Sequence, residues 1–310
     1  MIDIQKIYDE LQQGDSFKRI KQENSPISIY CGLREANMPS IAFLCKTPPI
    51  LIESTQYLRV SQWEEKDKVY WTSFDLQLAN ARTIFYSLCL DLINAIDGAK
   101  NETEAICAVK SRYMVWRKMF RKATTPMSFE AYQGLYGELY FLYFELTKKY
   151  SLEDAIKAWS GANRTAKDFS INEDWFEIKT TTTNATEVKI SSLTQLDSDE
   201  DGHLVVLRIE KMSEEYNDGH ATVNQLMSLI LKDILDEGLK DNFLEKVAAY
   251  GYVVEDELQQ YPTFKLHRVD SYRVNEQFPK ITSRDVAFDE ITKVTYCISI
   301  NGIKSFLEVQ

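Results

Sequence analysis

The sequence has few of the residues that build zinc sites or disulfide frameworks. Its five cysteines are odd in number and widely spaced, no CxxC pair occurs, and the three histidines are scattered. Apolar neighbours flank most of the cysteines, which is typical of core thiols in a reducing compartment. The sequence therefore predicts neither a disulfide framework nor a zinc site. We expect His203, His220 and His267 to be structural.

Long hydrophobic runs and an excess of positive charge are also missing. No apolar run approaches the roughly 18 residues that cross a bilayer, and the opening "MIDIQKIYDELQQ" is an amphipathic helical pattern, not a secretory signal. The chain has 36 Lys and Arg against 47 Asp and Glu, a net charge of −11 that opposes nonspecific attraction to DNA. We expect a cytoplasmic protein without membrane association. If it acts on nucleic acid, it needs a local basic face or a partner.

The chain has 310 residues, of which 44% are hydrophobic. This length and composition suit one large domain or two of ordinary size. After the opening helix, four β-rich runs separated by turn-like segments predict an antiparallel meander, and two helical patterns follow. The segment "TTPM" then breaks the chain at residues 123–127. We predict an N-terminal α+β module over residues 1–124, for partner or DNA recognition, and a second domain over residues 125–310.

The second half mixes helical and strand patterns, without an internal repeat or a long low-complexity segment. Helices are predicted over residues 128–150, 222–238 and 241–251, and strands over residues 187–196, 203–211, 264–275 and 293–300. This order predicts an α/β fold in which helices flank a mixed central sheet.

One stretch in that half, "KDFSINEDWFEIKTTTT" (residues 167–183), places charges in what otherwise reads as a buried strand. A buried charge is costly unless it is paired or holds a metal. Successive strand residues point to opposite faces, so Glu177 and Lys179 share one face, with attachment points roughly 6.7 Å apart. Phe176 and Ile178 share the other face.

The same alternation restricts how the hairpin can pair. A loop with an even number of residues, such as Glu173 and Asp174, places Asp168 opposite Lys179. An odd loop would turn Asp168 to the apolar face. The hydrophobic pattern therefore selects the register that collects Asp168, Glu177 and Lys179 on one face.

Two carboxylates and an ammonium group at one place favour a metal site. Neighbouring carboxylates repel each other, and one of them takes up a proton unless a cation neutralises the pair. Mg²⁺ prefers oxygen ligands and usually keeps several waters, which suits a few carboxylates and a substrate phosphate. A water activated by the metal, with a lysine that stabilises charge on phosphorus, would hydrolyse a phosphodiester.

At these residues the sequence resembles a known group of proteins. Asp168, a short hairpin and then Glu177-Ile178-Lys179 are similar to the motif of the PD-(D/E)XK superfamily, the fold of many restriction endonucleases. The sequence resembles a bacterial family of PD-(D/E)XK proteins more closely. This resemblance covers about residues 125–300 and extends more loosely to the first half of the chain. The segments that carry this likeness are, in order, "GLYGELYFL", "AWSG", "KDF", "FEIKTT", "VKISSLTQL", "VVLRIE" and "FPKIT".

The resemblance implies a restriction-endonuclease-like nuclease and assigns roles in a metal-dependent catalytic site to particular residues. Asp168 and Glu177 would hold Mg²⁺, for which Mn²⁺ could substitute, Lys179 would assist catalysis, and Glu138 would be an accessory metal ligand. It also implies DNA as substrate and a place in restriction-like antiphage systems, beside ATPase or helicase-like partner proteins. The sequence departs from the motif at its first letter, where Lys167 stands in place of proline.

Other residues leave alternatives open. Glu64-Glu65-Lys66 and Glu187-Val188-Lys189 also fit Glu-x-Lys, and the second is the runner-up, although no acidic residue clearly precedes it on a paired strand. Glu138 is either a ligand or part of the polar side of an amphipathic helix. Glycines beside Glu138, at positions 134 and 137, would let that helix approach the sheet closely enough to deliver the carboxylate.

A basic helix is the candidate DNA contact outside this site. The stretch "VKSRYMVWRKMFRK" (residues 109–122) has six basic residues and no acidic one. Lys110, Arg117 and Arg121 recur at helical spacing and could follow a DNA backbone. We favour the simpler interpretation, a solvated basic face or a surface that docks the acidic second half. Gln195 could contact substrate or merely end a strand.

The leading prediction is a Mg²⁺-dependent DNA endonuclease. The competing prediction is a noncatalytic scaffold or DNA-docking subunit that retains the nuclease fold. A third is a nuclease that is active only inside a complex. Cutting both strands of a duplex in one event would need two sites, for which a homodimer is one arrangement.

Overall fold

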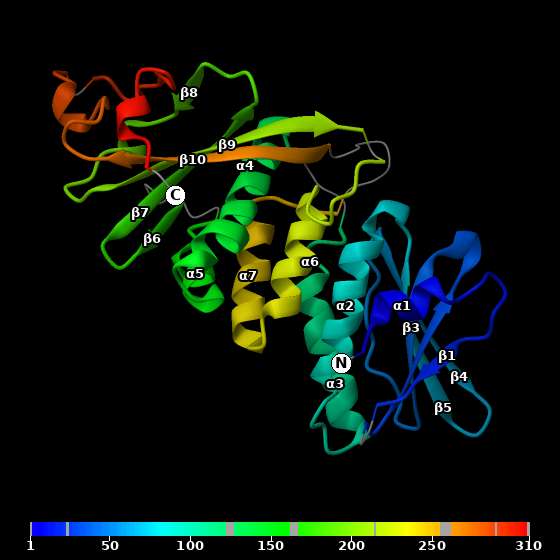
Figure 1. Cartoon of the computed structure of the whole chain (residues 1–310). Helices are drawn as coiled ribbons and strands as arrows, with labels where there is room; N and C mark the ends of the chain where they lie inside the picture. The colour runs from blue at the N-terminus through cyan, green and yellow to red at the C-terminus, as the bar shows by residue number, and fades with distance from the viewer. Residues whose placement is uncertain are drawn as a thin grey trace. The chain divides into compact units, whose positions relative to one another are not determined.

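The computed structural model describes residues 2–22, 25–121, 127–161, 167–213, 215–254, 262–288 and 290–308. The chain forms two compact units, Met1–Pro126 with Gly251–Gln260 and Met127–Tyr250 with Tyr261–Gln310. Each unit has a sheet of its own (Figure 1). The expected break at residues 123–127 lies, except for Met127, outside the described residues.

The first unit is built on a five-stranded antiparallel sheet in the order β1-β2-β3-β5-β4. The sheet is antiparallel as predicted, but the prediction of a simple meander was wrong, because β5 and not β4 pairs with β3 and β4 lies at the edge. The strands are β1 (Lys18–Ile20), β2 (Ser28–Leu33), β3 (Pro39–Cys45), β4 (Leu58–Glu65) and β5 (Val69–Leu76).

Three helices complete this unit: α1 (Ile4–Asp9), α2 (Arg82–Ala95) and α3 (Glu102–Trp116). A buried ion pair joins the two longer ones, since Arg112 of α3 lies 2.5 Å from Asp91 of α2. The Trp116 indole donates to the same carboxylate at 2.7 Å. Removing one partner of such a pair would leave an unpaired buried charge, so this contact fixes how α2 and α3 pack.

The second unit has a four-stranded sheet in the order β10-β9-β7-β6. Strands β7 and β9 run parallel and the other neighbours run antiparallel, so the sheet is mixed. A separate two-stranded sheet pairs β8 with β11. The strands are β6 (Phe169–Ile171), β7 (Asp174–Thr182), β8 (Glu187–Ile190), β9 (Gly202–Met212), β10 (Thr263–Val274) and β11 (Tyr296–Ser299).

Helices cover one face of this sheet, and β8 with β11 covers the other (Figure 1). On the helical side, Tyr136 of α4 packs against Phe264 of β10 with ring centroids 4.8 Å apart. On the other side, Trp175 of β7 belongs to a buried cluster with Ile190 of β8 and Ile298 of β11. Because both faces are covered, the central strand β9 is apolar along most of its length.

The helices of this unit begin at capping residues that the sequence supplies. They are α4 (Phe129–Tyr140), α5 (Leu152–Ala158), α6 (Val223–Asp233) and α7 (Glu237–Ala249). Thr222 and Gln225 form a capping box for α6, and Asp236 caps α7. The helix predicted over residues 222–238 was therefore too long, because Ile234 is extended and the Asp236 cap starts a new helix.

The observed architecture confirms the predicted fold class, which combines a mixed central sheet flanked by helices with an N-terminal antiparallel β and helical module. In the part of the chain that the structure describes, no helix is both long and apolar enough to cross a membrane. Of the five free cysteines, Cys31, Cys45 and Cys89 are buried as expected, whereas Cys107 and Cys297 are exposed.

Helix α4 approaches strand β7 very closely at Gly137. A Cβ atom at this position would lie 1.8 Å from Thr180 Oγ1, far inside van der Waals contact. At Gly134, one turn earlier, the nearest atom would be the Tyr250 hydroxyl at 3.3 Å. The glycine at 137 thus permits the close approach that the sequence led us to expect, and it brings the neighbouring Glu138 toward the hairpin.

This contact predicts a difference between two glycines of one helix. Gly137→Ala should lower the free energy of unfolding by roughly 1 to 3 kcal/mol, because the added methyl group overpacks the helix–strand contact. Gly134→Ala is the matched control and should be close to neutral, and adding Thr180→Ala to Gly137→Ala should restore part of the loss. Urea denaturation of the four proteins measures this; equal stability of both single variants would contradict the described contact.

Candidate metal-binding and catalytic site

The site begins with the β6–β7 hairpin, whose register pairs Phe169 with Phe176 and Ile171 with Asp174. The two loop residues are therefore Asn172 and Glu173, and not Glu173 and Asp174 as the sequence suggested. Asn172 has a φ of 54°, a left-handed conformation that asparagine tolerates better than most residues. The correction shifts the pairing by two residues, so the face of every side chain stays as predicted.

With this register, Asp168 lies one step beyond the paired residues, opposite Glu177. A hydrogen bond confirms the proximity, because the Ile178 amide donates to Asp168 Oδ2 at 2.7 Å. Lys179 follows on the same face as Glu177, and its Nζ lies 2.7 Å from Glu177 Oε1. The three residues that strand alternation grouped are therefore together.

The face of the hairpin that carries Glu177 and Lys179 is less exposed to water than the sequence indicated. Strand alternation allowed these charges to lie outside the core, but the Glu177 side chain is only 1% exposed and that of Lys179 is 17% exposed. Their neighbour on the same face, Trp175, is part of the cluster under β8 and β11. That cluster excludes water from the face that carries the charges.

Burial changes the protonation of both carboxyl groups. It raises the pKa of Glu177 to about 8, against the opposing effect of Lys179 and with an added contribution from the charge of Asp168. Burial also raises the pKa of Asp168, although Lys179 and the Ile178 amide oppose the increase. The protein therefore holds two carboxyl groups in a place where neither ionises easily, as expected where a cation would neutralise them.

Glu138 lies in the same electrostatic environment but is already bonded. Its Oε2 accepts from the Trp159 indole at 2.7 Å, and its Oε1 accepts from the Tyr250 hydroxyl at 2.8 Å. Burial and then the charge of Asp168 raise the pKa of Glu138 well above its usual range. Sequence reasoning missed Trp159 and Tyr250, because they lie 21 and 112 residues from Glu138 and no local pattern connects them.

Lys167, which stands where the motif has proline, ties the start of β6 to another loop. Its Nζ donates to the carbonyl oxygens of Thr194, Gln195 and Asp197 at 2.9, 2.8 and 3.0 Å. It also lies 3.9 Å from the centre of the Trp175 ring. Burial lowers the pKa of Lys167 to about 8. The lysine thus holds in place the backbone that leads into Asp168.

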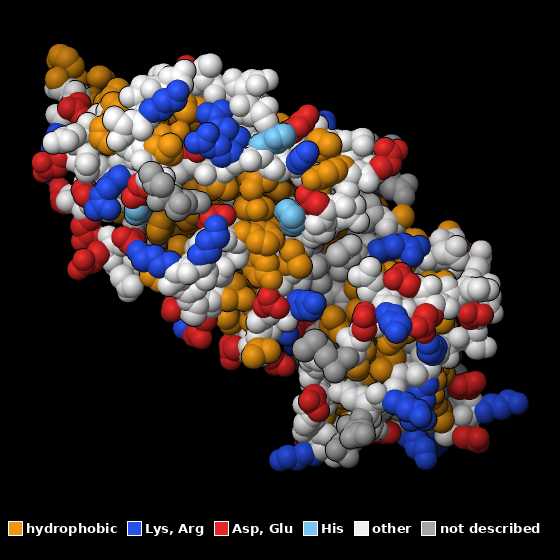
Figure 2. Space-filling model, viewed as in Figure 1, with side chains coloured by type: hydrophobic (Ala, Val, Ile, Leu, Met, Phe, Trp, Pro, Cys, Tyr) orange, Lys and Arg blue, Asp and Glu red, His pale blue; other side chains and the backbone are white. Residues whose placement is uncertain are grey.

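The remaining predicted residues lie elsewhere. Gln195 is in a short 3-10 turn beside β8, where its side chain accepts from the Ser191 amide at 2.7 Å. Lys110, Arg117 and Arg121 belong to the first unit, and Arg117 pairs with Glu53 at 2.9 Å. On the face shown in Figure 2, lysine and arginine side chains are scattered among acidic ones, without a continuous basic surface. Their role as DNA contacts stays a prediction.

The two other Glu-x-Lys triplets have no comparable surroundings. Glu187 and Lys189 are exposed on β8, whose partner strand β11 carries no acidic residue. Glu65 ends β4, where it accepts from the Trp71 indole at 2.9 Å. Of the three triplets, only Glu177-Ile178-Lys179 lies on a desolvated face beside a further carboxylate.

A two-carboxylate metal site fits these residues, whereas a three-carboxylate site does not fit this arrangement. Within the described segments, no three His, Cys, Asp or Glu side chains are placed to share a metal ion. Asp168 Oδ2 and Glu177 Oε1 are hydrogen bonded, and the second oxygen of each has no donor among the described residues. Both oxygens of Glu138 are engaged, so its role as a metal ligand stays a prediction.

A mixed sheet with Asp168 and Glu177-Ile178-Lys179 on one hairpin, next to a helix that supplies Glu138, defines a PD-(D/E)XK nuclease-like fold. The chain matches, over residues 4–301, the family described as "Putative PD-(D/E)XK family member, (DUF4420)", and it belongs to that family. The superfamily consists in general of nucleases, which typically use divalent metals. No curated protein and no solved structure matches the chain.

The raised pKa of Glu177 predicts a pH-dependent stability in the absence of metal. Between the ordinary value of 4.5 and about 8, the folded protein binds more protons than the unfolded chain. The free energy of unfolding should therefore fall as pH rises through this window, by on the order of 1 to 3 kcal/mol. Glu177→Gln should remove the part of that dependence that Glu177 contributes, because glutamine does not ionise, while the raised pKa values of Asp168 and Glu138 should leave a remainder.

Urea denaturation in EDTA at about pH 5 and about pH 8 measures the effect. Glu187→Gln is the matched control, since Glu187 is an exposed strand glutamate and its variant should keep the wild-type dependence. The same pH dependence in wild type and Glu177→Gln would show that Glu177 ionises normally.

Proposed function

We propose that the chain is a metal-dependent endonuclease that hydrolyses phosphodiester bonds in DNA. The observation that carries this proposal is the placement of Asp168 and Glu177 opposite each other on one buried hairpin face, with the Lys179 ammonium 2.7 Å from Glu177. A structural ion pair would need only one acid and one base. Lys167 is a second cation whose charge acts on both carboxylates, but its Nζ donates to backbone carbonyl oxygens, and within the described residues no lysine or arginine is at ion-pair distance from Asp168. This arrangement favours a site for a divalent cation.

Asp168 and Glu177 would hold Mg²⁺, or Mn²⁺ as a substitute. A hard divalent ion at this place would neutralise both carboxylates and make a water nucleophilic enough to attack phosphorus at neutral pH. The buried position favours this, because electrostatic interactions are stronger where water is excluded.

Lys179 would act on the substrate and not on the protein fold. Its ammonium has three donors, of which one is used on Glu177 and the others can reach a phosphate oxygen. In hydrolysis, water adds to phosphorus, the bond to the leaving oxygen breaks, and negative charge grows on the phosphoryl oxygens. A fixed cation beside them would lower the barrier.

A noncatalytic subunit is the second candidate. It is favoured by the engagement of Glu138 with Trp159 and Tyr250, which leaves two carboxylates where the family resemblance suggests three. Such a subunit would keep the fold and dock DNA or a partner. A role in restriction-like antiphage defence, ATPase or helicase-like partners, and a homodimer that cuts both strands are further proposals that follow from the family.

Plasmid cleavage tests the proposed activity. With Mg²⁺ or Mn²⁺, the purified protein should nick or cut supercoiled DNA, and EDTA should stop it. Asp168→Ala and Lys179→Ala should each reduce the rate by a factor on the order of 100 or more, since each removes a charge that acts on the reacting phosphate. Lys189→Ala is the matched control, a strand lysine in the runner-up triplet, and should cut like the wild type.

Unchanged cleavage by both Asp168→Ala and Lys179→Ala would contradict the assignment of these residues to the catalytic site. If the wild-type chain is inactive, it is either a nuclease that needs its complex or a noncatalytic scaffold. A Mn²⁺ titration separates the two, because the nuclease should still bind the ion through Asp168 and the scaffold should not.

A further inference from the structure

The segment "FPKIT" (residues 278–282) carries part of the family resemblance, but it has no role yet in the carboxylate site. It lies in the stretch that connects β10 to β11. Two of its residues are anchored: the Phe278 side chain is buried in the cluster under β8 and β11, and the Ile281 amide donates to the Tyr296 hydroxyl at 3.2 Å. Lys280 stands between these anchors, so its backbone is held on both sides.

Tyr296 begins β11 with its ring on the side that faces β7. Alternate residues of this strand, Tyr296 and Ile298, pack on the cluster that covers β7, whereas Cys297 between them is exposed. Lys179 belongs to the covered face of β7, and its ammonium is near enough to oppose the increase that burial gives to the pKa of Tyr296. The Tyr296 hydroxyl accepts from the Ile281 amide, but among the described residues it has no acceptor for its own hydrogen. It therefore presents a free donor beside Lys179.

The turn that Lys167 holds is also bonded to the segment of Lys280. Lys167 donates to the Asp197 carbonyl oxygen at 3.0 Å, and the Asp197 carboxylate accepts from the Ser283 hydroxyl at 2.7 Å. The charge of Lys280 is close enough to act with burial, which has the larger effect, in lowering the pKa of Lys167. Within the described segments, no acidic side chain lies at ion-pair distance from Lys280, which is only partly exposed. Its charge is therefore available to an anion next to Asp168.

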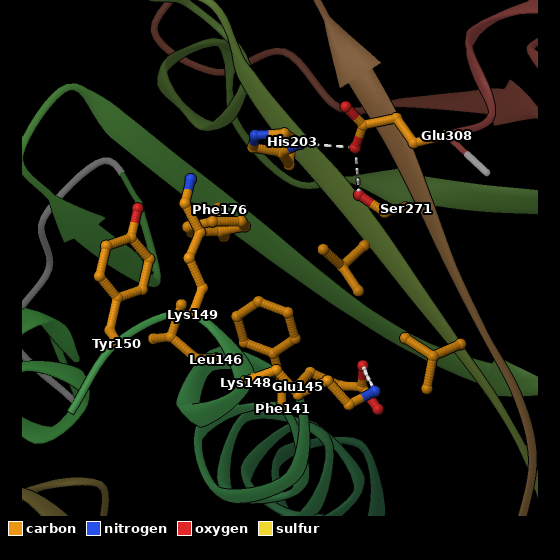
Figure 3. Close-up of a pocket in the computed structure, with 12 residues that line it drawn as sticks. Phe141, Glu145, Leu146, Lys148, Lys149, Tyr150, Phe176, His203, Ser271 and Glu308 are labelled. Carbon is orange, nitrogen blue, oxygen red and sulfur yellow. Dashed lines mark hydrogen bonds and ion pairs between the residues drawn. The ribbon is translucent and has the colours of Figure 1, made fainter. Parts of the chain in front are cut away.

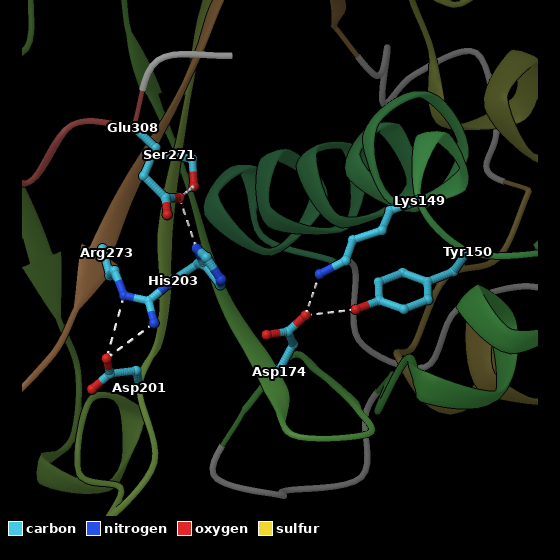
Figure 4. Close-up of polar contacts among 8 residues, drawn as sticks. All are labelled: Lys149, Tyr150, Asp174, Asp201, His203, Ser271, Arg273 and Glu308. Atoms are coloured by element: carbon cyan, nitrogen blue, oxygen red, sulfur yellow. Dashed lines mark hydrogen bonds and ion pairs between the residues drawn. The ribbon is translucent and has the colours of Figure 1, made fainter.

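The groove on the opposite face of the sheet differs, because its side chains already contact one another. The Phe176 ring stacks on His203, with centroids 4.8 Å apart (Figure 3). The polar groups at its rims are paired as well, Lys149 with Asp174 at 2.6 Å and His203 with Glu308 at 2.8 Å (Figure 4). Unused donors are therefore a feature of the face that carries the carboxylate site.

We propose that Lys280 and Tyr296 bind a backbone phosphate of DNA and so position the strand over Asp168 and Glu177. An ammonium group binds phosphate as a point charge, and a tyrosine hydroxyl donates to a phosphate oxygen. The anchors on both sides of Lys280 reduce the entropy that binding would cost. A chain with a net charge of −11 needs such a local cationic contact to hold DNA. The inference rests on the proposed function, since it assigns substrate contacts to the same site.

Fluorescence anisotropy of a short labelled DNA duplex in EDTA tests these contacts. Every protein, including the parent, carries Asp168→Asn, so that no metal-dependent cleavage can occur. Lys280→Met should weaken binding about tenfold and lower the slope of log K against log salt by about 1, because one phosphate contact is lost. Tyr296→Phe should weaken binding by roughly three- to tenfold without changing the slope, because a hydroxyl group carries no charge. A merely structural role of Lys280 would not change the slope.

Two matched controls lie on the helical side of the sheet. Lys149→Met removes the same charge as Lys280→Met, and Tyr143→Phe removes a hydroxyl that donates to Asp233 at 2.6 Å. Both should bind DNA like the parent and with the slope of the parent. Urea denaturation should show that all four variants are folded.

Binding like that of the parent by Lys280→Met or by Tyr296→Phe would overturn the proposal. So would an equal loss in Lys149→Met, which would show an effect of net charge alone, or a parent that binds no DNA. Because no cleavage is measured, failure here is separable from failure of the nuclease assignment. Plasmid cleavage together with DNA binding that ignores both substitutions would keep the nuclease and reject these contacts, and binding that depends on both without any cleavage would support the contacts in a noncatalytic subunit.

Discussion

The electrostatic conflict between Asp168 and Glu177 is the constraint on which the site depends. Folding the hairpin brings the two carboxyl groups together on a face from which the Trp175 cluster excludes water. The Lys179 ammonium lies 2.7 Å from Glu177, and the charge of Lys167 has a smaller effect on both carboxyl groups. The pKa of both carboxyl groups is therefore raised, and the folded protein maintains this arrangement at a cost that a divalent cation would offset.

The two faces of strand β7 have different surroundings. Its odd-numbered residues, including Glu177 and Lys179, face the β8–β11 layer, and its even-numbered residues, including Phe176, face the helices. Phe176 stacks on His203 of β9, and Glu177 lies in the carboxylate site. The two residues are adjacent on a strand that pairs with β6 over its first three residues and with β9 from Phe176 to Thr182.

Short-range sequence patterns predicted which residues of the site lie together, but not which residues surround them. Strand alternation alone placed Asp168, Glu177 and Lys179 on one face, because a side chain's face depends only on parity. Alternation could not show which two residues form the turn, because moving the pairing by two residues leaves every side chain on the same face. The observed turn begins at Asn172, which adopts the left-handed conformation. It also could not show that Glu177 is buried, which depends on a layer formed by strands far along the chain.

The fold class followed from the order of elements and from the family resemblance, while some boundaries did not. The pattern over residues 222–238 looks like one helix, but Asp236 is also a capping residue and starts α7. Contacts of high sequence separation were not predictable: Tyr250 with Glu138, or His203 with Glu308. The first of these contacts decides whether Glu138 is free to bind a metal.

The central claim is that Asp168 and Glu177 share one divalent ion. A crystal structure of the protein soaked in Mn²⁺, with anomalous scattering to locate the ion, tests it directly. The account predicts a single Mn²⁺ in contact with an oxygen of Asp168 and an oxygen of Glu177, with the Lys179 ammonium beside the site. No ion between these carboxylates, at a Mn²⁺ concentration that occupies other carboxylates of the protein, would contradict it.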